Sequence, residues 1–204
     1  HSPTAAERQA VRARYDNADE PLLLIPGITY PHKNHLTVIE AFDRVAAVHP
    51  GVRLVLSGGA GPSEAEVQRR IGRSPARERI RRVGRIPRGD LDTLYWEASA
   101  LVFPETFAGF GMPVLVAMGR GCPVLVADTP ALAEVAGDAG VVVAAHDVRA
   151  WAEAMTMVVD DPTERRALVE RGDRRTAAFG WSTSVATLFG VYRRVAGLHP
   201  VVAP

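Results

Sequence analysis

Six short runs of aliphatic residues, separated by segments with the spacing of helices, constrain the fold of this chain more than any other feature. The runs are almost continuous in Val, Leu and Ile, which is typical of strands buried on both faces of a parallel sheet. Because strands and helices alternate, the sequence predicts an α/β fold with a Rossmann-like, doubly wound parallel sheet of about six strands. The predicted strands are residues 22–25, 53–57, 80–83, 100–103, 123–127 and 141–144.

The chain divides into three parts. Residues 1–20 are polar and partly helical, so we expect an interdomain linker with a lead-in helix. Residues 21–178 hold all the predicted strands and are expected to form one Rossmann-like domain. After residue 146 three helical patterns follow without a strand, and the last of them lies in residues 179–204. Helix caps are expected at Ser63 (in a capping box with Glu66), Thr129, Asp147 and Asp161.

The composition excludes several classes of function. A net charge of +1 in 204 residues gives no electrostatic footprint for nucleic acid, and no apolar run approaches the ~18 residues of a membrane span. Cys122 is the only cysteine, which excludes an internal disulfide and a thiolate metal cluster and fits a cytoplasmic location. His32 and His35 lie three residues apart without a nearby carboxylate or thiolate, so no metal site is expected.

Several of the loops that follow the predicted strands are rich in glycine. In a parallel sheet ligands bind at the carboxyl ends of the strands, so these loops are the candidate site. The loop "PETFAGFGMP" leads into a helix whose first free N–H groups could hold a phosphate, and Gly109 and Gly111 allow close approach of a ligand. Lys33, the only lysine, follows the first strand and could reach that phosphate, with Asn34 capping the next helix. The plainer alternatives are a packing turn and a solvated lysine.

Two other classes of enzyme are disfavoured. Ser57 and Ser63 have no matched His and Asp at the spacing of a nucleophile elbow, so acyl transfer is unsupported. A dinucleotide-dependent oxidoreductase is disfavoured because the first strand is followed by "GITYPHK" and not by G-x-G-x-x-G.

Taken together, the motifs resemble the C-terminal half of retaining glycosyltransferases of the GT-B fold, in the large family 4. The resemblance covers residues 22–195, nearly the whole chain. Its motifs are "PHKNHLTVIEAF", "LVLSGGAG", "VGRIPRGDLDTLYWEASALVFPETFAGFGMPVLVAMGRGCPVLVAD", "PALAEVAGDAG" and "GWSTSVATLFGVYRRV".

The resemblance implies that residues 21–178 are the domain that binds the donor substrate, a nucleotide sugar, and that no further cofactor is used. It also implies that no metal is needed, because the helix end and basic side chains stabilise the departing diphosphate. It implies a separate N-terminal acceptor-binding domain that this chain does not contain, and the final helix is expected to cross back to it. The donor phosphates are expected at Gly27, Thr29, Lys33, Gly111, Met112, Val114 and Leu115. The base is expected at Arg85 and Ile86, and the sugar at Gly109 and Phe110. Peripheral membrane contact through the missing domain is left open.

The sequence departs from the family pattern at its carboxylates. The family usually has one glutamate before "GFG", at the donor sugar, and a second eight residues later, at the ribose; the matching positions are Ala108 and Val116. A basic side chain common five residues before the lysine is also absent, since that position is Ile28. Glu105 remains as a substitute for one lost contact or as a solvated residue at a strand end, and no catalytic residue is intact.

Two functional hypotheses follow. The first is the donor-binding domain of a metal-independent, hexosyltransferase-like enzyme in bacterial glycan biosynthesis, inactive as an isolated domain. The second is a catalytically impaired pseudo-glycosyltransferase that binds a nucleotide or a partner without transferring a sugar. The missing glutamates favour the second hypothesis, and the "GFG" turn with Lys33 favours the first.

Overall fold

The described part of the computed structural model, residues 2–15 and 20–197, contains one parallel sheet of six strands. The strand order is β3-β2-β1-β4-β5-β6, so the first strand lies beside the fourth. All six predicted strands are confirmed, and the central ones are buried because they are aliphatic on both faces. The strands are β1 Leu22–Pro26, β2 Arg53–Ser57, β3 Ile80–Gly84, β4 Ala100–Phe103, β5 Val124–Ala127 and β6 Gly140–Val143.

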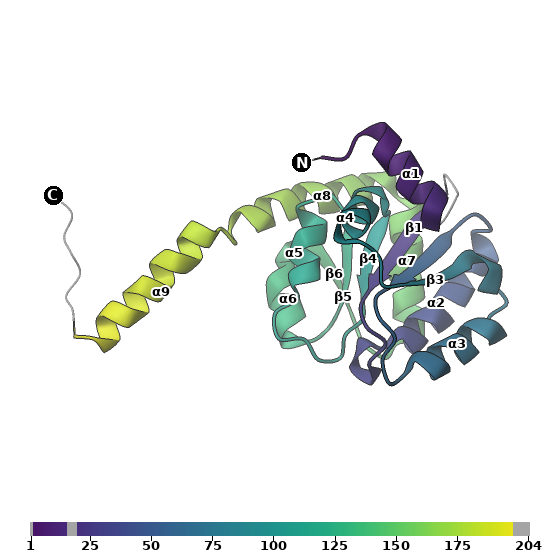
Figure 1. The fold of residues 1–204 in the computed structure, drawn as a ribbon, viewed down its shortest axis with the longest axis horizontal. Coiled ribbons are helices and arrows are strands. Elements are labelled where there is room, and N and C mark those ends of the chain that lie inside the picture. The colour runs from purple at the N-terminus through teal and green to yellow at the C-terminus, as the bar shows by residue number, and fades with distance from the viewer. Residues whose placement is uncertain (1, 16–19, 198–204) are drawn as a thin grey trace.

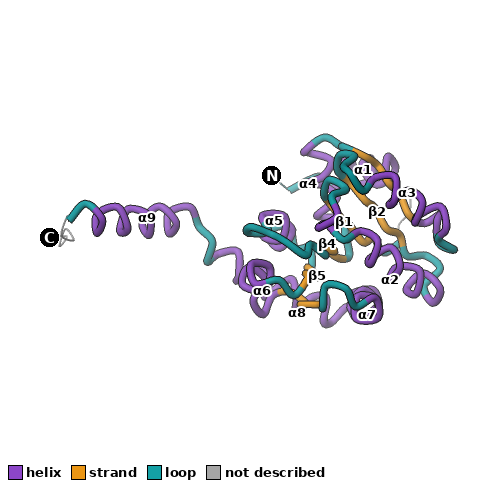
Figure 2. Tube along the Cα trace, turned by 90° about the horizontal axis from the view of Figure 1, so that it is seen from below, coloured by secondary structure: helices purple, strands orange, loops and turns teal. Residues whose placement is uncertain are grey.

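Helices cover both faces of the sheet, as the doubly wound fold predicts (Figure 1). One layer contains α2 (His35–Val48), α3 (Glu64–Arg73) and α7 (Val148–Asp160). The other contains α4 (Arg88–Glu97), α5 (Met112–Met118) and α6 (Pro130–Ala136). Figure 2 shows the sheet between the layers. Three short 3₁₀ turns complete the body: η1 Pro31–Lys33, η2 Arg77–Arg79 and η3 Gly137–Ala139. Phe42 and Trp151 are fully buried between helices and sheet.

The lead-in helix α1 (Ala5–Tyr15) packs against α4. Val11 is buried there, and Asp90 accepts hydrogen bonds from Arg14 at 2.6 Å and from Tyr15 at 2.5 Å. This helix therefore lies on the body of the domain. Its expected role as a linker to another domain stays a prediction.

The C-terminal helices differ sharply in their packing. Helix α8 (Pro162–Ala177) packs against α5 and α7, whereas α9 (Trp181–Val195) extends away from the sheet (Figure 1). No residue of α9 is buried, although Trp181, Phe189 and Tyr192 are large and apolar. These apolar side chains are therefore largely open to solvent within the described residues. None of the helices in the described ranges is long and apolar enough to cross a membrane.

Two of the five predicted caps are confirmed by side-chain hydrogen bonds. Asp147 accepts from the amides of Arg149 and Ala150, and Asp161 accepts in the same way at the start of α8. The caps predicted at Ser63 and Thr129 are wrong, because neither side chain bonds to its helix. Ser63 lies in a turn conformation (φ −91°, ψ 5°) and not in the extended conformation of a capping residue.

Candidate functional site

The strand order places a switch point between β1 and β4. The chain leaves β1 toward α2 on one face and leaves β4 toward α5 on the other, so the two loops diverge at the point where sheets of this kind bind ligands. The loops are joined at one place, where the backbone N–H of Thr106 donates to the carbonyl of His32 at 2.8 Å and its hydroxyl donates to the same oxygen at 3.3 Å. The candidate site lies where these loops meet.

Lys33 and Glu105 meet at this switch point, one from each loop. The Lys33 ammonium forms an ion pair with the Glu105 carboxylate and lies 5.6 Å from the centre of the Phe103 ring. Its aliphatic stem passes over Gly27, where an added Cβ would lie 3.5 Å from Lys33 Cδ. Glu105 is only 5 % exposed. The interpretations of Lys33 and Glu105 as solvated residues are therefore wrong.

Asn34 holds Lys33 in this position. It has the left-handed conformation (φ 51°), which ends the η1 turn and starts α2. Its side-chain amide donates to the carbonyl of Ala145 at 2.6 Å and accepts from the hydroxyl of Thr37 at 2.7 Å. The expected backbone cap is therefore absent, because both ends of the amide are used to fix the loop.

Thr29 connects the loop after β1 to the loop after β2. The residue is fully buried; its hydroxyl donates to Glu64 at 2.8 Å and accepts from the N–H of Gly61 at 2.7 Å. Burial raises the pKa of Glu64, but hydrogen bonds from Arg82, Gln68 and Thr29 outweigh it and hold the pKa below its ordinary value. The expectation that Thr29 touches a phosphate is corrected: it positions the loops and has no open surface here.

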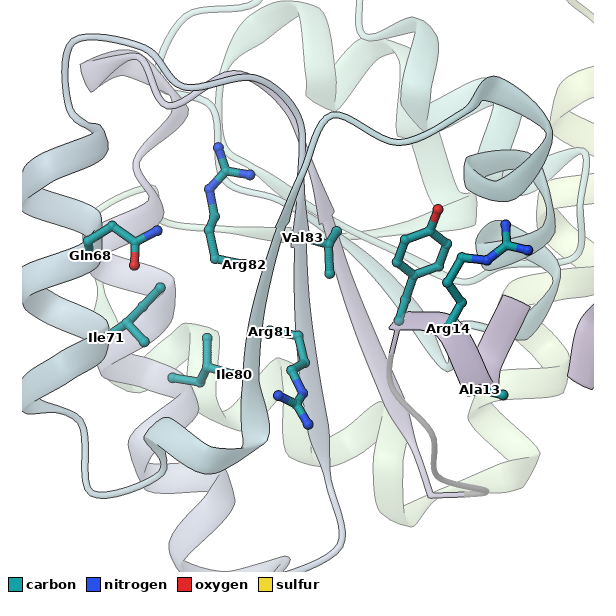
Figure 3. Close-up of a pocket in the computed structure, with 9 residues that line it drawn as sticks. Ala13, Arg14, Gln68, Ile71, Ile80, Arg81, Arg82 and Val83 are labelled. Carbon is teal, nitrogen blue, oxygen red and sulfur yellow. The ribbon is translucent and has the colours of Figure 1, made fainter. Parts of the chain in front are cut away.

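Arg82 is a residue beside the candidate site whose role in holding the loops the sequence analysis missed. Its guanidinium, 7 % exposed, donates to the carbonyls of Gly58 (2.7 Å) and Gly59 (3.0 Å) and pairs with Glu64 at 2.9 Å. Two adjacent arginines within the predicted strand "IRRV" were the available signal. Figure 3 shows Arg82 and Arg81 on opposite sides of β3. A groove of about 520 Å³ runs along this edge strand between α3 and the end of α1.

His35 lies beside this network, at the start of α2. It is 3 % exposed, and neither ring nitrogen has a hydrogen-bond partner among the described residues. Burial, followed by the positive charges of Arg82 and Lys33, lowers the pKa of His35 to about 4. His35 is therefore neutral at physiological pH.

Acid is expected to destabilise the domain through His35. Between pH 6.5 and 4 the unfolded chain binds a proton at His35 that the folded chain excludes, so stability is complete above this window and falls with pH. The loss between pH 7 and pH 4.5 is about 2 kcal/mol from this residue. Urea titrations at both pH values, for the parent and for His35→Gln, measure it as the difference between the two pH dependences. Equal pH dependences would contradict the assignment.

The "GFG" turn leads from β4 into α5. Gly111 is left-handed (φ +94°), and its carbonyl accepts from the N–H of Val114 at 2.9 Å. Val114 is fully buried, which corrects the expectation that it contacts a phosphate. Phe110 and Met112 are exposed beside the turn, and their predicted roles stay predictions.

An apolar hollow of about 400 Å³ opens between α5 and the start of α9. Val116, at the second lost glutamate position, lies in its wall. Phe110 makes an edge-to-face contact with Phe179, with ring centres 6.0 Å apart. The other lining residues are Met112, Leu115, Gly119, Thr176, Trp181 and Ser184. Ala108, at the first lost glutamate position, is half-buried against the core. Neither of the two positions carries an acidic side chain.

The loop after β3 carries the residues expected at the base. Arg85 is exposed, Ile86 packs partly against the core, and the carbonyl of Gly84 accepts from the N–H of Gly58 at 2.7 Å. This bond joins the β2 and β3 loops, and the base contact stays a prediction. Within the described ranges no three His, Cys, Asp or Glu residues gather where they could hold a metal ion.

Comparison with known proteins places this geometry in context. Residues 7–175 match the model of a family described as "Glycosyl transferases group 1". The O-antigen chain mannosyltransferase B of Escherichia coli is 30 % identical over 190 residues, which is 92 % of this chain and 50 % of that protein. A D-inositol 3-phosphate glycosyltransferase of Streptosporangium roseum is 31 % identical, over 96 % of this chain and 48 % of its own length. The chain thus spans about half the length of the curated relatives it matches.

A solved structure agrees in fold. Sucrose-phosphate synthase from Thermosynechococcus elongatus superposes with a TM-score of 0.81 at 25 % identity, over 96 % of this chain and 50 % of its own. The chain is similar to one half of a larger protein in each of these comparisons.

Proposed function

Because this chain belongs to the group 1 glycosyl transferases, we propose that it is the donor-binding half of a retaining, metal-independent enzyme. The enzyme transfers a sugar from a nucleotide-diphosphate sugar to an acceptor. The observation that carries the proposal is the meeting of the β1 and β4 loops at the switch point, with the only lysine of the chain between them. A ligand with a diphosphate finds there a cation and glycine backbone that it can approach closely.

In the proposed reaction the residues of the candidate site have three roles. Lys33 offsets the charge that builds up on the departing diphosphate, which lowers the barrier in a site that excludes water. The Gly109–Gly111 turn brings backbone N–H groups close to the phosphates. The network of Arg82, Glu64 and Thr29 holds the neighbouring loops in place, so that Lys33 needs no rearrangement of the backbone.

The acceptor is proposed to bind to a second half that lies N-terminal to this one in the whole protein. Support comes from the relatives, of which the chain spans about half, and from α9, none of whose apolar residues is buried against the domain. Trp181 and Phe189 on α9 are 83 % and 63 % exposed. A helix with such a face needs a partner, and the missing half is the proposed one.

An impaired, non-transferring module is the second candidate. The observation that favours it is the Lys33–Glu105 pair, which neutralises the lysine while the positions at Ala108 and Val116 carry no charge. A transfer assay on the whole protein with radiolabelled nucleotide sugars separates the candidates. Nucleotide binding without transfer or hydrolysis would favour the module.

Substituting Gly109 tests where the ligand lies. An added Cβ at Gly109 meets nothing within 4 Å, so Gly109→Val is expected to fold normally and to lose at least about tenfold in affinity for a nucleoside diphosphate. Calorimetry with uridine, guanosine and adenosine diphosphates measures it. Gly111 cannot serve for this test, because a side chain there is strained at φ +94° and would meet Leu132 Cδ2 at 2.7 Å.

Gly72→Val is the matched control for Gly109→Val. Gly72 also has open space around its Cβ position, but it lies in α3 and away from both loops. The affinity of Gly72→Val for a nucleoside diphosphate is expected to equal that of the parent. Equal affinity of Gly109→Val and the parent would place the ligand elsewhere.

A further inference from the structure

We propose that Glu105 is a specificity-determining residue of the candidate site: its carboxylate occupies Lys33 in the empty protein, and a ligand must displace it. The inference rests on the proposed function, since it takes the switch point as the place where a phosphate binds. The ligand class follows from the competition. A dianionic phosphate or a diphosphate can displace a buried carboxylate from Lys33, whereas a singly charged anion cannot.

The geometry shows a built contact and not a chance surface pair. Glu105 is 5 % exposed, whereas exposed ion pairs join side chains that are free to move. Lys33 is held at both ends of its stem, by the η1 turn with Asn34 and by the ring of Phe103. The pair joins residues 72 positions apart, and the Thr106–His32 hydrogen bonds clamp the same two loops together. The ammonium is therefore fixed on the carboxylate before any ligand arrives.

The scarcity of other charged side chains near the Lys33–Glu105 pair determines how the pair affects anion binding. Lys33 is the only lysine, and from Thr106 to Ala127 the only charged side chain is Arg120, which pairs with Asp92 at 2.8 Å. A phosphate at the "GFG" turn therefore meets a cation whose charge is already neutralised by Glu105. After displacement, a partly buried carboxylate stands beside an anion, and like charges in a site of low dielectric repel strongly. Glu105 thus weakens the binding of every anion at this site and prevents the binding of singly charged anions.

The single lysine makes the pair directly observable. Protein labelled with ¹³C at the lysine ε position gives one lysine signal in a carbon–proton NMR spectrum. In the unliganded protein, Glu105→Gln is expected to move this signal, because the ammonium loses its carboxylate partner. An unmoved signal would mean that the pair does not form in solution, and this result overturns the proposal without any ligand.

Binding measurements then test the competition. Uridine, guanosine and adenosine diphosphates and inorganic pyrophosphate are titrated into the parent and into Glu105→Gln by calorimetry. Glutamine keeps the shape of the side chain and removes its charge, so the variant is expected to bind the diphosphates about tenfold more tightly. The same titrations with acetate and chloride are expected to show binding, if any, only in the variant.

Two control variants test whether the tighter diphosphate binding is specific to the removal of the Glu105 charge. Asp128→Asn removes a charge at the same end of the sheet, beyond β5, and an asparagine oxygen can still accept from the N–H of Ala145. Its affinity is expected to change by less than twofold. In a Lys33→Ala background, Glu105→Gln is expected to tighten binding by less than it does in the parent, since the competition for the lysine is gone and only the repulsion between the carboxylate and the ligand remains.

The outcomes separate the two proposals. Diphosphate binding in the parent without tightening in Glu105→Gln, or equal tightening in Asp128→Asn, overturns the role of Glu105 and leaves the proposed function standing. Absence of diphosphate binding in the parent and in Glu105→Gln overturns the proposed function together with this inference. Binding seen only in Glu105→Gln supports both.

Discussion

Replacing Gly58 with alanine is expected to lower the free energy of unfolding by about 4 kcal/mol, the sum of ~1–3 kcal/mol for backbone strain and ~1–3 kcal/mol for overpacking. Gly58 has φ +125°, where an L residue is strained, and its added Cβ would lie 2.1 Å from the carbonyl oxygen of Gly27. That neighbour is backbone and cannot rotate away. Urea denaturation followed by circular dichroism measures the loss.

The adjacent glycine provides the control. An added Cβ at Gly59 meets only Ile28 Cγ1 at 3.8 Å, which is ordinary contact. Gly59→Ala is therefore expected to change stability by less than about 0.5 kcal/mol. Equal stability of the two variants would mean that the β1 and β2 loops do not approach each other as closely as described.

Replacing Arg82 with alanine is expected to cost about 3–5 kcal/mol of stability, because it leaves a buried network without its cation. The carbonyls of Gly58 and Gly59 lose their donor, and Glu64 keeps its charge with Thr29 and Gln68 as its remaining partners. The loops after β1 and β2 then separate, so affinity for a nucleoside diphosphate is expected to fall as well. Denaturation and calorimetry on one preparation measure both effects.

Arg81→Ala is the matched control for Arg82→Ala. Arg81 is the next residue on the same strand, but it is exposed and lies on the other side of β3 (Figure 3). Its removal is expected to change stability by less than about 0.5 kcal/mol. Loss of stability as large as that of Arg82→Ala would show that charge on the strand matters and the network does not.

These two variants also bear on function. Gly58 and Arg82 touch no proposed ligand, yet they pack and bond in the loops after β1 and β2, and Lys33 projects from the first of these. A site for a diphosphate needs its donors held in place before the ligand arrives. Among the contacts that join the loops of this domain are the hydrogen bonds of Gly58 with Gly84, Thr29 with Gly61, and Thr106 with His32.

The fold could be predicted closely, and the side-chain contacts of the site could not. Six aliphatic runs became six parallel strands, with ends that differ by at most one residue, and α1 lies within the predicted lead-in segment of residues 1–20. The cap at Ser63 fails because its backbone is in a turn conformation that composition does not reveal, whereas Thr129 is extended and its side chain still does not bond to the helix. Thr29 and Val114 sit in glycine-rich loops, where the sequence does not distinguish a buried residue from a ligand contact.

The amino-acid sequence by itself determined the class of fold and the family, because aliphatic periodicity and glycine positions are local properties, and it predicts the loops in which a ligand would bind. Only the tertiary structure decided the partners of the charged groups. Lys33 and Glu105 meet because the strand order sets β4 beside β1, and Arg82 reaches Gly58 and Glu64 because β3 lies beside β2. An ion pair depends on distance in space, and no spacing along the chain encodes the separation of two loops that follow different strands.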